Sequence, residues 1–282
     1  MKKSLMFKQL LLGFLLLLLL GCSYSPLSLE SFYNDLASDI ADELKNTIDL
    51  TPAQRAEIDR YAKELILWHR HYKLPVYAQQ LALLANDIRQ GAITPARLLP
   101  VVTLFDAIPH FDEARQLTYR ITKVASSLND KQVHQLQQVL NNEIQQDQLE
   151  IKQSPYATEL RDGIKFMFRF MGVHLNQQQQ QLVSQEAAQF ADTRPLELTM
   201  AKRWNKQFIQ SLQQRKSPQF AARFAQLWDH KSSFNAPQTQ RNKQRMAELL
   251  SQLIQRLTPD QREKLVSQLT SISNTFSEMA NK

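Results

Sequence analysis

The sequence predicts an all-α protein, a multi-helix, bundle-like array in which prolines kink or break the helices. Apolar residues recur at helical spacing almost throughout the 282 residues, and sustained alternation of apolar and polar residues, as in strands, is hard to find. Only three glycines follow the first 21 residues, namely Gly91, Gly163 and Gly172. We therefore expect a long succession of helices.

The first 21 residues have the features of a cleaved secretory signal peptide. Residues 1–3 read Met-Lys-Lys, an apolar run covers 10–20, and Gly21 stands directly before Cys22. This run is short for a membrane span, which needs roughly 20 residues. With Leu19 three residues before Cys22, the segment resembles the lipobox of bacterial lipoproteins.

That resemblance implies that Cys22 is the lipidation site and carries acyl chains such as palmitate, which anchor the protein to a membrane. Ser23 after the cysteine implies the outer membrane, with the protein on the periplasmic face. No other cysteine exists, so no disulfide is expected. The expected organisation is a signal peptide over 1–21, a lipidated tether over 22–28 and an all-helical periplasmic domain over 29–282, with a possible sub-boundary near 153–156.

Helical spacing and prolines define the expected helices. The first has an apolar face formed by Leu29, Phe32, Leu36, Ile40 and Leu44. A second starts at Pro52, is kinked or broken by Pro75 and resumes to Gly91, and the next opens at Thr94-Pro95 and is interrupted by Pro100 and Pro109. The remaining ranges are 111–126, 130–152, 155–172, 177–191, 195–214, 217–230, 238–256 and 259–280.

Charge is unevenly distributed. The first helix is acidic, whereas residues 194–264 contain fourteen Lys/Arg and five Asp/Glu. One interpretation is that the acidic helix packs near the basic half. The alternative is a cationic face for phospholipid headgroups, peptidoglycan or an acidic protein. Nucleic acid is not expected as a partner of an exported protein.

One short motif recurs at helix starts: Leu50-Thr51-Pro52-Ala53-Gln54 and Leu257-Thr258-Pro259-Asp260-Gln261, with weaker copies at 128–132 and 175–179. A Thr or Asn N-cap followed three residues later by Gln is a capping box, and Pro suits the first helical position. Leu-Thr-x-x-Gln also resembles the signature of small periplasmic helical chaperones. The sequence leaves open whether the motif is more than a helix cap.

A second resemblance covers most of the chain. Asp49-Leu50-Thr51-Pro52 with Gln54, then Trp68-His69-Arg70, then Leu74-Pro75 with Tyr77, is similar to the N-terminal signature of uncharacterised proteobacterial outer-membrane-type lipoproteins, a domain of unknown function. Residues 128–132, 171–179 and 257–262 are similar too. The resemblance implies no activity and no cofactor.

The densest group of functional side chains is Trp68-His69-Arg70-His71-Tyr72. His69 and His71 are two residues apart and point about 200° apart on a helix, so they do not form a metal site. We expect Trp68 in the core, and His69, Arg70 and Tyr72 bonded to carbonyls freed at Pro75. The alternative is an anion-binding site. The partner-binding candidates are Trp68, His69, Arg70, Tyr72 and Tyr77.

Two aromatic groups are expected in the core rather than on a client-binding surface. They are Phe166, Met167, Phe168, Phe170 and Met171, and Trp204, Phe208, Phe220, Phe224 and Trp228. No phosphate loop, nucleophile elbow or Ser/His/Asp set is evident. We expect a non-enzymatic binding or scaffold lipoprotein of the envelope without a metal or cofactor. The alternatives are a holdase-type chaperone and a peptidoglycan-active enzyme.

Overall fold

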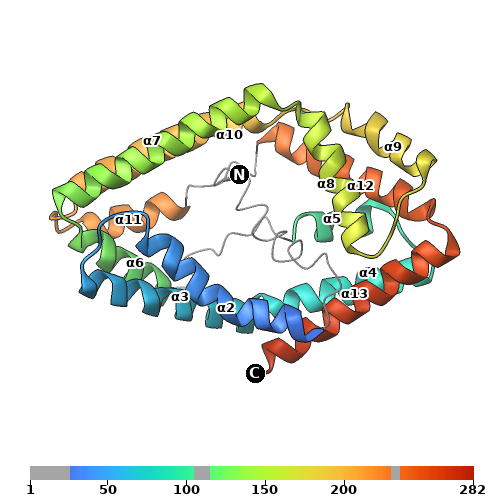
Figure 1. Cartoon of the computed structure of the whole chain (residues 1–282), viewed down its shortest axis with the longest axis horizontal. Coiled ribbons are helices and arrows are strands. Elements are labelled where there is room, and N and C mark those ends of the chain that lie inside the picture. The colour runs from blue at the N-terminus through green and yellow to red at the C-terminus, as the bar shows by residue number, and fades with distance from the viewer. Residues whose placement is uncertain (1–25, 105–114, 230–235) are drawn as a thin grey trace.

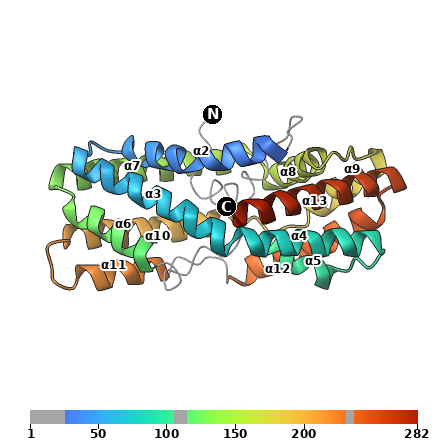
Figure 2. The ribbon, with the colours of Figure 1, turned by 90° about the horizontal axis from the view of Figure 1, so that it is seen from below.

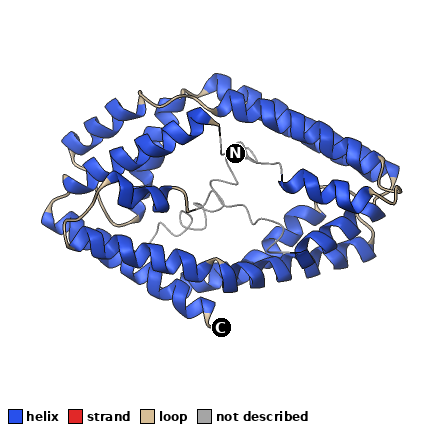
Figure 3. Ribbon diagram, turned by 180° about the vertical axis from the view of Figure 1, so that it is seen from behind, coloured by secondary structure: helices blue, strands red, loops and turns tan. Residues whose placement is uncertain are grey.

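The computed structural model describes residues 26–104, 115–229 and 236–282. Within these ranges every regular element is a helix, and no strand occurs (Figure 3), so the all-α prediction is confirmed. The helices are α2 (Pro26–Lys45), α3 (Pro52–Tyr72), α4 (Leu74–Arg89), α5 (Pro95–Val102), α6 (Arg115–Ser127), α7 (Asp130–Gln153), α8 (Tyr156–Phe170), α9 (Gln177–Ala187), α10 (Arg194–Gln213), α11 (Phe220–Asp229), α12 (Pro237–Gln255) and α13 (Pro259–Ala280).

The helices follow an elongated closed outline. In Figure 1, α7 and α10 form one long upper side, and α2, α3, α4 and α13 form the lower side. The turns before α3 and α7 meet at the left end, whereas the turns before α9 and α13 meet at the right end. The edge view shows most helices lying close to the long axis (Figure 2).

Most predicted helix starts agree with the structure. Threonine or asparagine N-caps bond to the third helical residue at α3, α5, α7, α9 and α13. Proline is the first residue of α3, α5, α12 and α13, where its missing N–H has no helical partner to lose. The capping-box interpretation of the repeated motif is therefore confirmed.

Prolines act differently at two predicted breaks. At Pro75 the break is real but comes earlier, at Lys73, because Pro75 is already the second residue of α4. Pro100 does not end its helix, since α5 continues to Val102. At that position only one backbone bond, to Ala96, is lost, and Pro100 itself is exposed. Pro109 lies outside the described residues.

Glycine closes two helices. Gly91 after α4 and Gly172 after α8 adopt φ angles of 68° and 73°, which lie in the left-handed region. The amides of Ala92 and Val173, one residue on, donate back to carbonyls in the last turns of the helices at 2.9 and 2.8 Å. Only glycine takes this backbone conformation without a steric penalty, so these two positions set where the chain turns.

Two main apolar cores hold the helices. The larger core joins α2, α3, α4, α5, α8, α9, α12 and α13, and the smaller joins α6, α7, α10 and α11. The pairing of α4 with α13 is the most extensive helix contact described. The larger core takes residues from both sides of the predicted sub-boundary at 153–156, where α7 ends and α8 begins.

The first described helix buries Leu36, as expected, and also one residue that was not expected, Tyr33. Tyr33 is 1% exposed and Leu36 is 7% exposed, so the buried face includes Tyr33. The side chains of Leu29 and Phe32 lie outside the described set. The main contacts of α2 are with α3 and α13, and Glu30 pairs with Lys282 at 2.5 Å. The acidic helix therefore packs against α3 and the end of α13 rather than against the basic residues of α10 to α12.

The repeated motif does more than cap helices, because its glutamines also pair across the fold. Gln54 at the start of α3 and Gln132 at the start of α7 donate to each other's side-chain oxygens at 3.2 and 2.7 Å. Gln54 also donates to the carbonyl of Ser127, and Gln132 to the carbonyl of Asp49. Each acceptor lies two residues before the partner's N-cap.

The other end of the molecule repeats the same arrangement. Gln179 of α9 and Gln261 of α13 donate to each other at 2.8 and 3.1 Å. They also donate to the carbonyls of Arg256 and His174, again two residues before the partner's N-cap. We call each set a glutamine lock: one joins Gln54 to Gln132, and the other joins Gln179 to Gln261. The two locks fix the helix starts at both ends of the elongated outline (Figure 1).

Replacing Gln179 by glutamate separates the two roles of the motif. Glutamate still completes a capping box, but its carboxylate does not donate to Gln261 or to the Arg256 carbonyl. We expect Gln179→Glu to lower the free energy of unfolding by about 1–3 kcal/mol, because buried acceptors lose their donor. Chemical denaturation at neutral pH measures this. Gln178→Glu, exposed one residue earlier, is the matched control; equal stability of the two variants would reduce the motif to a cap.

Candidate functional site

The predicted lipidation site, Cys22, lies outside the described residues, which begin with α2 at Pro26. The five partner-binding candidates all lie within the described part. They gather where α3 ends and α4 begins, and the start of α2 packs beside them. The structure thus brings together Trp68, His69, Arg70, Tyr72 and Tyr77 in one region, although their side chains have different surroundings.

His69 forms the buried joint between α3 and α2. Its Nδ1 lies 2.9 Å from the hydroxyl of Tyr33, which also donates to the carbonyl of Ile66 at 3.3 Å. Burial lowers the pKa of His69 to about 4, and nearby Lys73 adds to this effect. Burial also raises the pKa of the Tyr33 phenol. His69 is therefore a neutral structural group at physiological pH.

Arg70 and Tyr77 extend the same joint. The guanidinium of Arg70 donates to the side chain of Asn34 at 2.9 Å and lies 5.5 Å from the centre of the Tyr33 ring. Tyr77 contacts His69 edge to face, with ring centres 5.5 Å apart, and lies 6.4 Å from the ring of Phe276. Burial raises the pKa of Tyr77 to about 12. These side chains tie α2, α3, α4 and α13 together.

The expected bonds to carbonyls freed at Pro75 are not what holds these side chains. His69 and Arg70 instead bond to Tyr33 and Asn34 of α2. The backbone supplies its own bonds at the break: the amide of Lys73 donates to His69 and that of Tyr77 to Lys73, at 2.9 and 3.0 Å. Because these backbone bonds continue the helical pattern through Lys73, the side chains of His69 and Arg70 are not needed at the break. They can bond to a neighbouring helix instead.

Trp68 and Tyr72 form the more accessible side of the region. Their rings stack with centres 6.2 Å apart, and the Nζ of Lys73 lies 5.2 Å from the indole centre. Trp68 is 9% exposed, as expected for a core residue, whereas Tyr72 is 64% exposed. The indole N–H of Trp68 is buried without a hydrogen-bond partner in the described structure. Of the five candidates, only Tyr72 presents most of its side chain to the surroundings.

The two predicted aromatic groups lie largely in the cores. Phe168, Phe170 and Met171 are buried in the larger core. Phe220 and Phe224 are buried in the smaller core, where Phe208 packs against Phe224 with ring centres 5.7 Å apart. Trp204 stacks on Phe208, and its N–H donates to the carbonyl of Leu227 at 3.1 Å. The side chain of Trp228 lies outside the described set.

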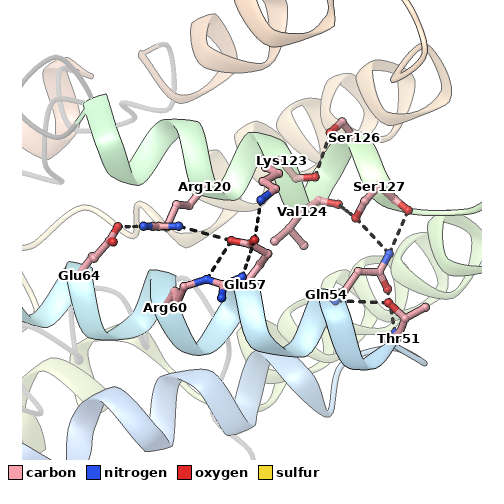
Figure 4. Close-up of polar contacts among 10 residues, drawn as sticks. All are labelled: Thr51, Gln54, Glu57, Arg60, Glu64, Arg120, Lys123, Val124, Ser126 and Ser127. Atoms are coloured by element: carbon pink, nitrogen blue, oxygen red, sulfur yellow. Dashed lines mark hydrogen bonds and ion pairs between the residues drawn. The ribbon is translucent and has the colours of Figure 1, made fainter.

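An ion-pair network around Glu57 is the clearest polar feature that the sequence did not predict (Figure 4). The carboxylate of Glu57 lies 2.5 Å from Arg60 and 2.6 Å from Lys123 of α6. Arg120 of α6 bridges Glu57 and Glu64 at 3.5 and 2.5 Å. Only the pair of Glu57 and Arg60, three residues apart on one helix, leaves a signal in the sequence.

Arg215 is a second structural cation. It is 7% exposed and donates to the carbonyls of Leu128 and Leu212 at 2.5 and 2.9 Å, and it pairs with Asp130. These bonds join the end of α10 to the turn before α7. A buried guanidinium needs such partners, since an unpaired buried charge is strongly destabilising.

A cationic surface lies on α10. Lys202, Arg203 and Lys206 are all exposed, and within the described ranges none of them has an ion-pair partner. Lys202 and Lys206 are four residues apart, and Arg203 and Lys206 three, so the three side chains share one face of the helix. No Asp or Glu occurs between Glu197 and Asp229. This α10 face is the strongest part of the basic region predicted from the sequence.

Two kinds of feature are absent from the described residues, namely a metal-binding cluster and a membrane-spanning helix. No group of three or more His, Cys, Asp or Glu side chains is placed to hold a metal ion there. None of the helices in the described ranges combines the length and the apolar character needed to cross a membrane. A shallow, mostly polar groove of about 420 Å³ lies between the α2–α3 turn and α7, where Asp49 bonds to Gln135 and Lys131.

The buried His69 predicts a pH dependence of stability. Because its pKa falls from 6.5 to about 4 on folding, protonation favours the unfolded chain. Stability present above pH 6.5 is therefore expected to decline as the pH falls toward 4. Denaturation at pH 7.5 and pH 5 measures the decline, and His69→Asn should flatten it. His71→Asn, at an exposed position of the same helix, should keep it; a flat wild-type profile would contradict the prediction.

The Glu57 network predicts a second, more acidic transition. Hydrogen bonds from Lys123 and Arg60 lower the pKa of Glu57 from 4.5 to about 2. This contribution to stability is present above pH 4.5 and is lost as the pH falls toward 2. Thermal unfolding of the wild type and of Glu57→Gln should differ at pH 6 and converge at low pH. Glu263→Gln, at an exposed position, should track the wild type throughout.

Comparison with known proteins places this helical frame in one family. The model of a family of unknown function (DUF6279) matches residues 46–241, which include the Trp68–Tyr77 region, the first glutamine lock and the α10 face. The motif at 257–262 lies beyond the matched range. No curated protein and no solved structure matches the chain. The chain belongs to the family of unknown function DUF6279.

Proposed function

We propose that this protein is a lipid-anchored lipoprotein of the outer membrane that faces the periplasm and acts as a non-enzymatic binding or scaffold protein. The signal-like residues 1–21 and the lipobox-like position of Cys22 support the anchor. The α10 face, formed by Lys202, Arg203 and Lys206, carries the binding proposal. Its partner is an acidic envelope protein or an anionic surface such as peptidoglycan or phospholipid.

The three cations of the α10 face do not stabilise the fold of the protein by itself. Like charges three or four residues apart on a helix are destabilising by roughly 0.2–0.5 kcal/mol per pair. Other cations of the described structure stabilise the fold. Arg215 is buried and forms an ion pair with Asp130, and Arg120 and Lys123 join α6 to α3 through ion pairs. Lys202, Arg203 and Lys206 make no such contact. Their repulsion is offset when an anionic partner binds.

The surroundings of the α10 face suit a polar contact. Gln207, Gln210 and Gln213 are exposed on the same helix, and their amides donate and accept hydrogen bonds without adding charge. Below them α10 is fixed by Ile209 and Leu212 in the smaller core. A rigid helix that presents cations and amides is suited to recognise carboxylate or phosphate groups.

Neutralising the α10 face should weaken partner capture. The test is in-cell cross-linking of the full lipoprotein, comparing the wild type with the combined variant Lys202→Gln, Arg203→Gln and Lys206→Gln. We expect loss of the captured partner with unchanged helicity. The matched control neutralises three exposed cations elsewhere, with Lys63→Gln, Arg89→Gln and Lys152→Gln, and should retain capture.

The outcomes separate the alternatives. One dominant envelope component, lost only in the α10 variant, supports the proposal. Equal capture by both variants would show that the α10 face is not the docking surface. A broad set of unfolded outer-membrane proteins, captured by both variants alike, would favour the holdase-type chaperone instead.

A further inference from the structure

We propose that the junction stripe, formed by the exposed Tyr72, Val76 and Leu83 together with the buried Trp68 that stacks on Tyr72, rests on the surface of the anchoring bilayer and contacts anionic phospholipid. The inference rests on the lipid anchor at Cys22 that is part of the proposed function. It adds a second contact between protein and membrane, and it orients the helical frame.

The junction stripe is a continuous face of the two helices. Trp68, Tyr72 and Val76 follow one another at intervals of four residues, and Leu83 comes seven later, so they lie within an arc of about 80° at 100° per residue. The helical hydrogen bonds continue through Lys73, which preserves this register. The core residues of α4, such as Leu74, Leu81 and Ala85, lie on the opposite side.

Exposed apolar side chains are concentrated there. In the described part of the chain six large hydrophobic residues are markedly exposed, and three of them, Tyr72, Val76 and Leu83, belong to the stripe. Tyr72 and Leu83 are 64% and 51% exposed. Burying such side chains is worth roughly 1.5–3 kcal/mol each when contact is complete. The stripe therefore favours an apolar or interfacial neighbour.

The chemistry of the stripe fits the interface of an anionic bilayer. Tryptophan and tyrosine are enriched at the level of the lipid headgroups. Lys73, which lies over the Trp68 ring, extends a charge from an apolar stem. No Asp or Glu occurs between Glu64 and Asp87. Positive charge next to aromatic and aliphatic side chains matches phosphate groups above acyl chains.

The anchor holds this region close to the membrane. Pro26 comes four positions after Cys22, a span of at most about 14 Å. From Pro26 to Tyr33, α2 advances about 10 Å. Tyr33 meets His69, and Asn34 meets Arg70, so the first turns of α2 lie on the end of α3 (Figures 1 and 2). Acyl chains on Cys22 therefore enter the bilayer within about 24 Å of the joint beside the stripe.

The unsatisfied indole of Trp68 is a further observation at the same place. Its N–H is buried without a partner in the described structure, whereas buried polar groups are normally bonded. Trp68 and its neighbours Tyr61 and Leu65 form a small apolar cluster of their own, separate from both main cores. Trp68 therefore lies outside the two main cores, and the exposed ring of Tyr72 stacks on it.

The experiment measures whether Trp68 meets lipid. The full processed lipoprotein carrying Trp204→Phe and Trp228→Phe, so that Trp68 is the only tryptophan, is reconstituted into vesicles of phosphatidylethanolamine and phosphatidylglycerol with brominated acyl chains. We expect quenching of Trp68 emission relative to the same lipids without bromine. Tyr72→Ser with Val76→Ser and Leu83→Ser should abolish that quenching while the protein stays membrane-bound. Circular dichroism checks that the variants remain helical.

A matched control removes exposed apolar side chains elsewhere. Tyr119→Ser with Leu149→Ser changes residues that are 68% and 48% exposed on α6 and α7, and quenching should persist. Absence of quenching in the anchored wild type would overturn the membrane contact and leave the anchor standing. An unmodified Cys22 by mass spectrometry would overturn the anchor and, with it, this inference. Loss of quenching in the control would show that the stripe has no special role.

Discussion

The two glutamine locks are the constraint on which the arrangement of the helices depends. In each lock a side-chain amide completes the cap of its own helix, pairs with the partner amide and bonds to the backbone before the partner helix. Gln132 and Gln179 are each only 2% exposed, so their side-chain amides must form their hydrogen bonds within the protein and not with water. The start of one helix is thereby fixed relative to another about eighty residues away. The locks thereby set the direction in which the long helices leave each end of the molecule, and the apolar cores pack between the two ends.

Much of the fold follows from local sequence signals. Thr51, Asn129, Asn176 and Thr258 mark helix starts because an N-cap oxygen and a glutamine three residues on satisfy amides that the helix leaves free. Gly91 marks a helix end through its positive φ angle. What the sequence did not reveal is tertiary: Gln54 and Gln132 are 78 positions apart, and without an alignment nothing marks them as partners. Pro100 also showed that one lost backbone bond is tolerated at an exposed position of a short helix.

In the candidate site, too, the sequence predicted the location of the functional side chains, whereas their tertiary partners became visible only in the fold. The sequence located the Trp68–Tyr77 region as a dense group of functional side chains, but which of them turn inward depends on α2. Tyr33 draws His69 into a buried joint, and Asn34 holds Arg70, so two residues that suggested binding have structural partners. Tyr72, which was one of the predicted binding candidates, and Val76, which was not, present the accessible surface. The basic region was visible from composition, whereas the distinction between buried Arg215 and exposed Lys202 required the fold.

The pairing of α4 with α13 has a consequence for the order in which the chain folds. Ser273 donates to the carbonyl of Ala78 at 2.8 Å, a contact between residues 195 positions apart, and Lys282 reaches Glu30 across 252 positions. The larger core therefore remains open until the last helix is available. A chain that is made from its N-terminus exposes the apolar faces of α2 and α4 until α13 is available, because contacts of such long range form late. The folding of this protein then depends on keeping an incomplete core from aggregating until α13 is available.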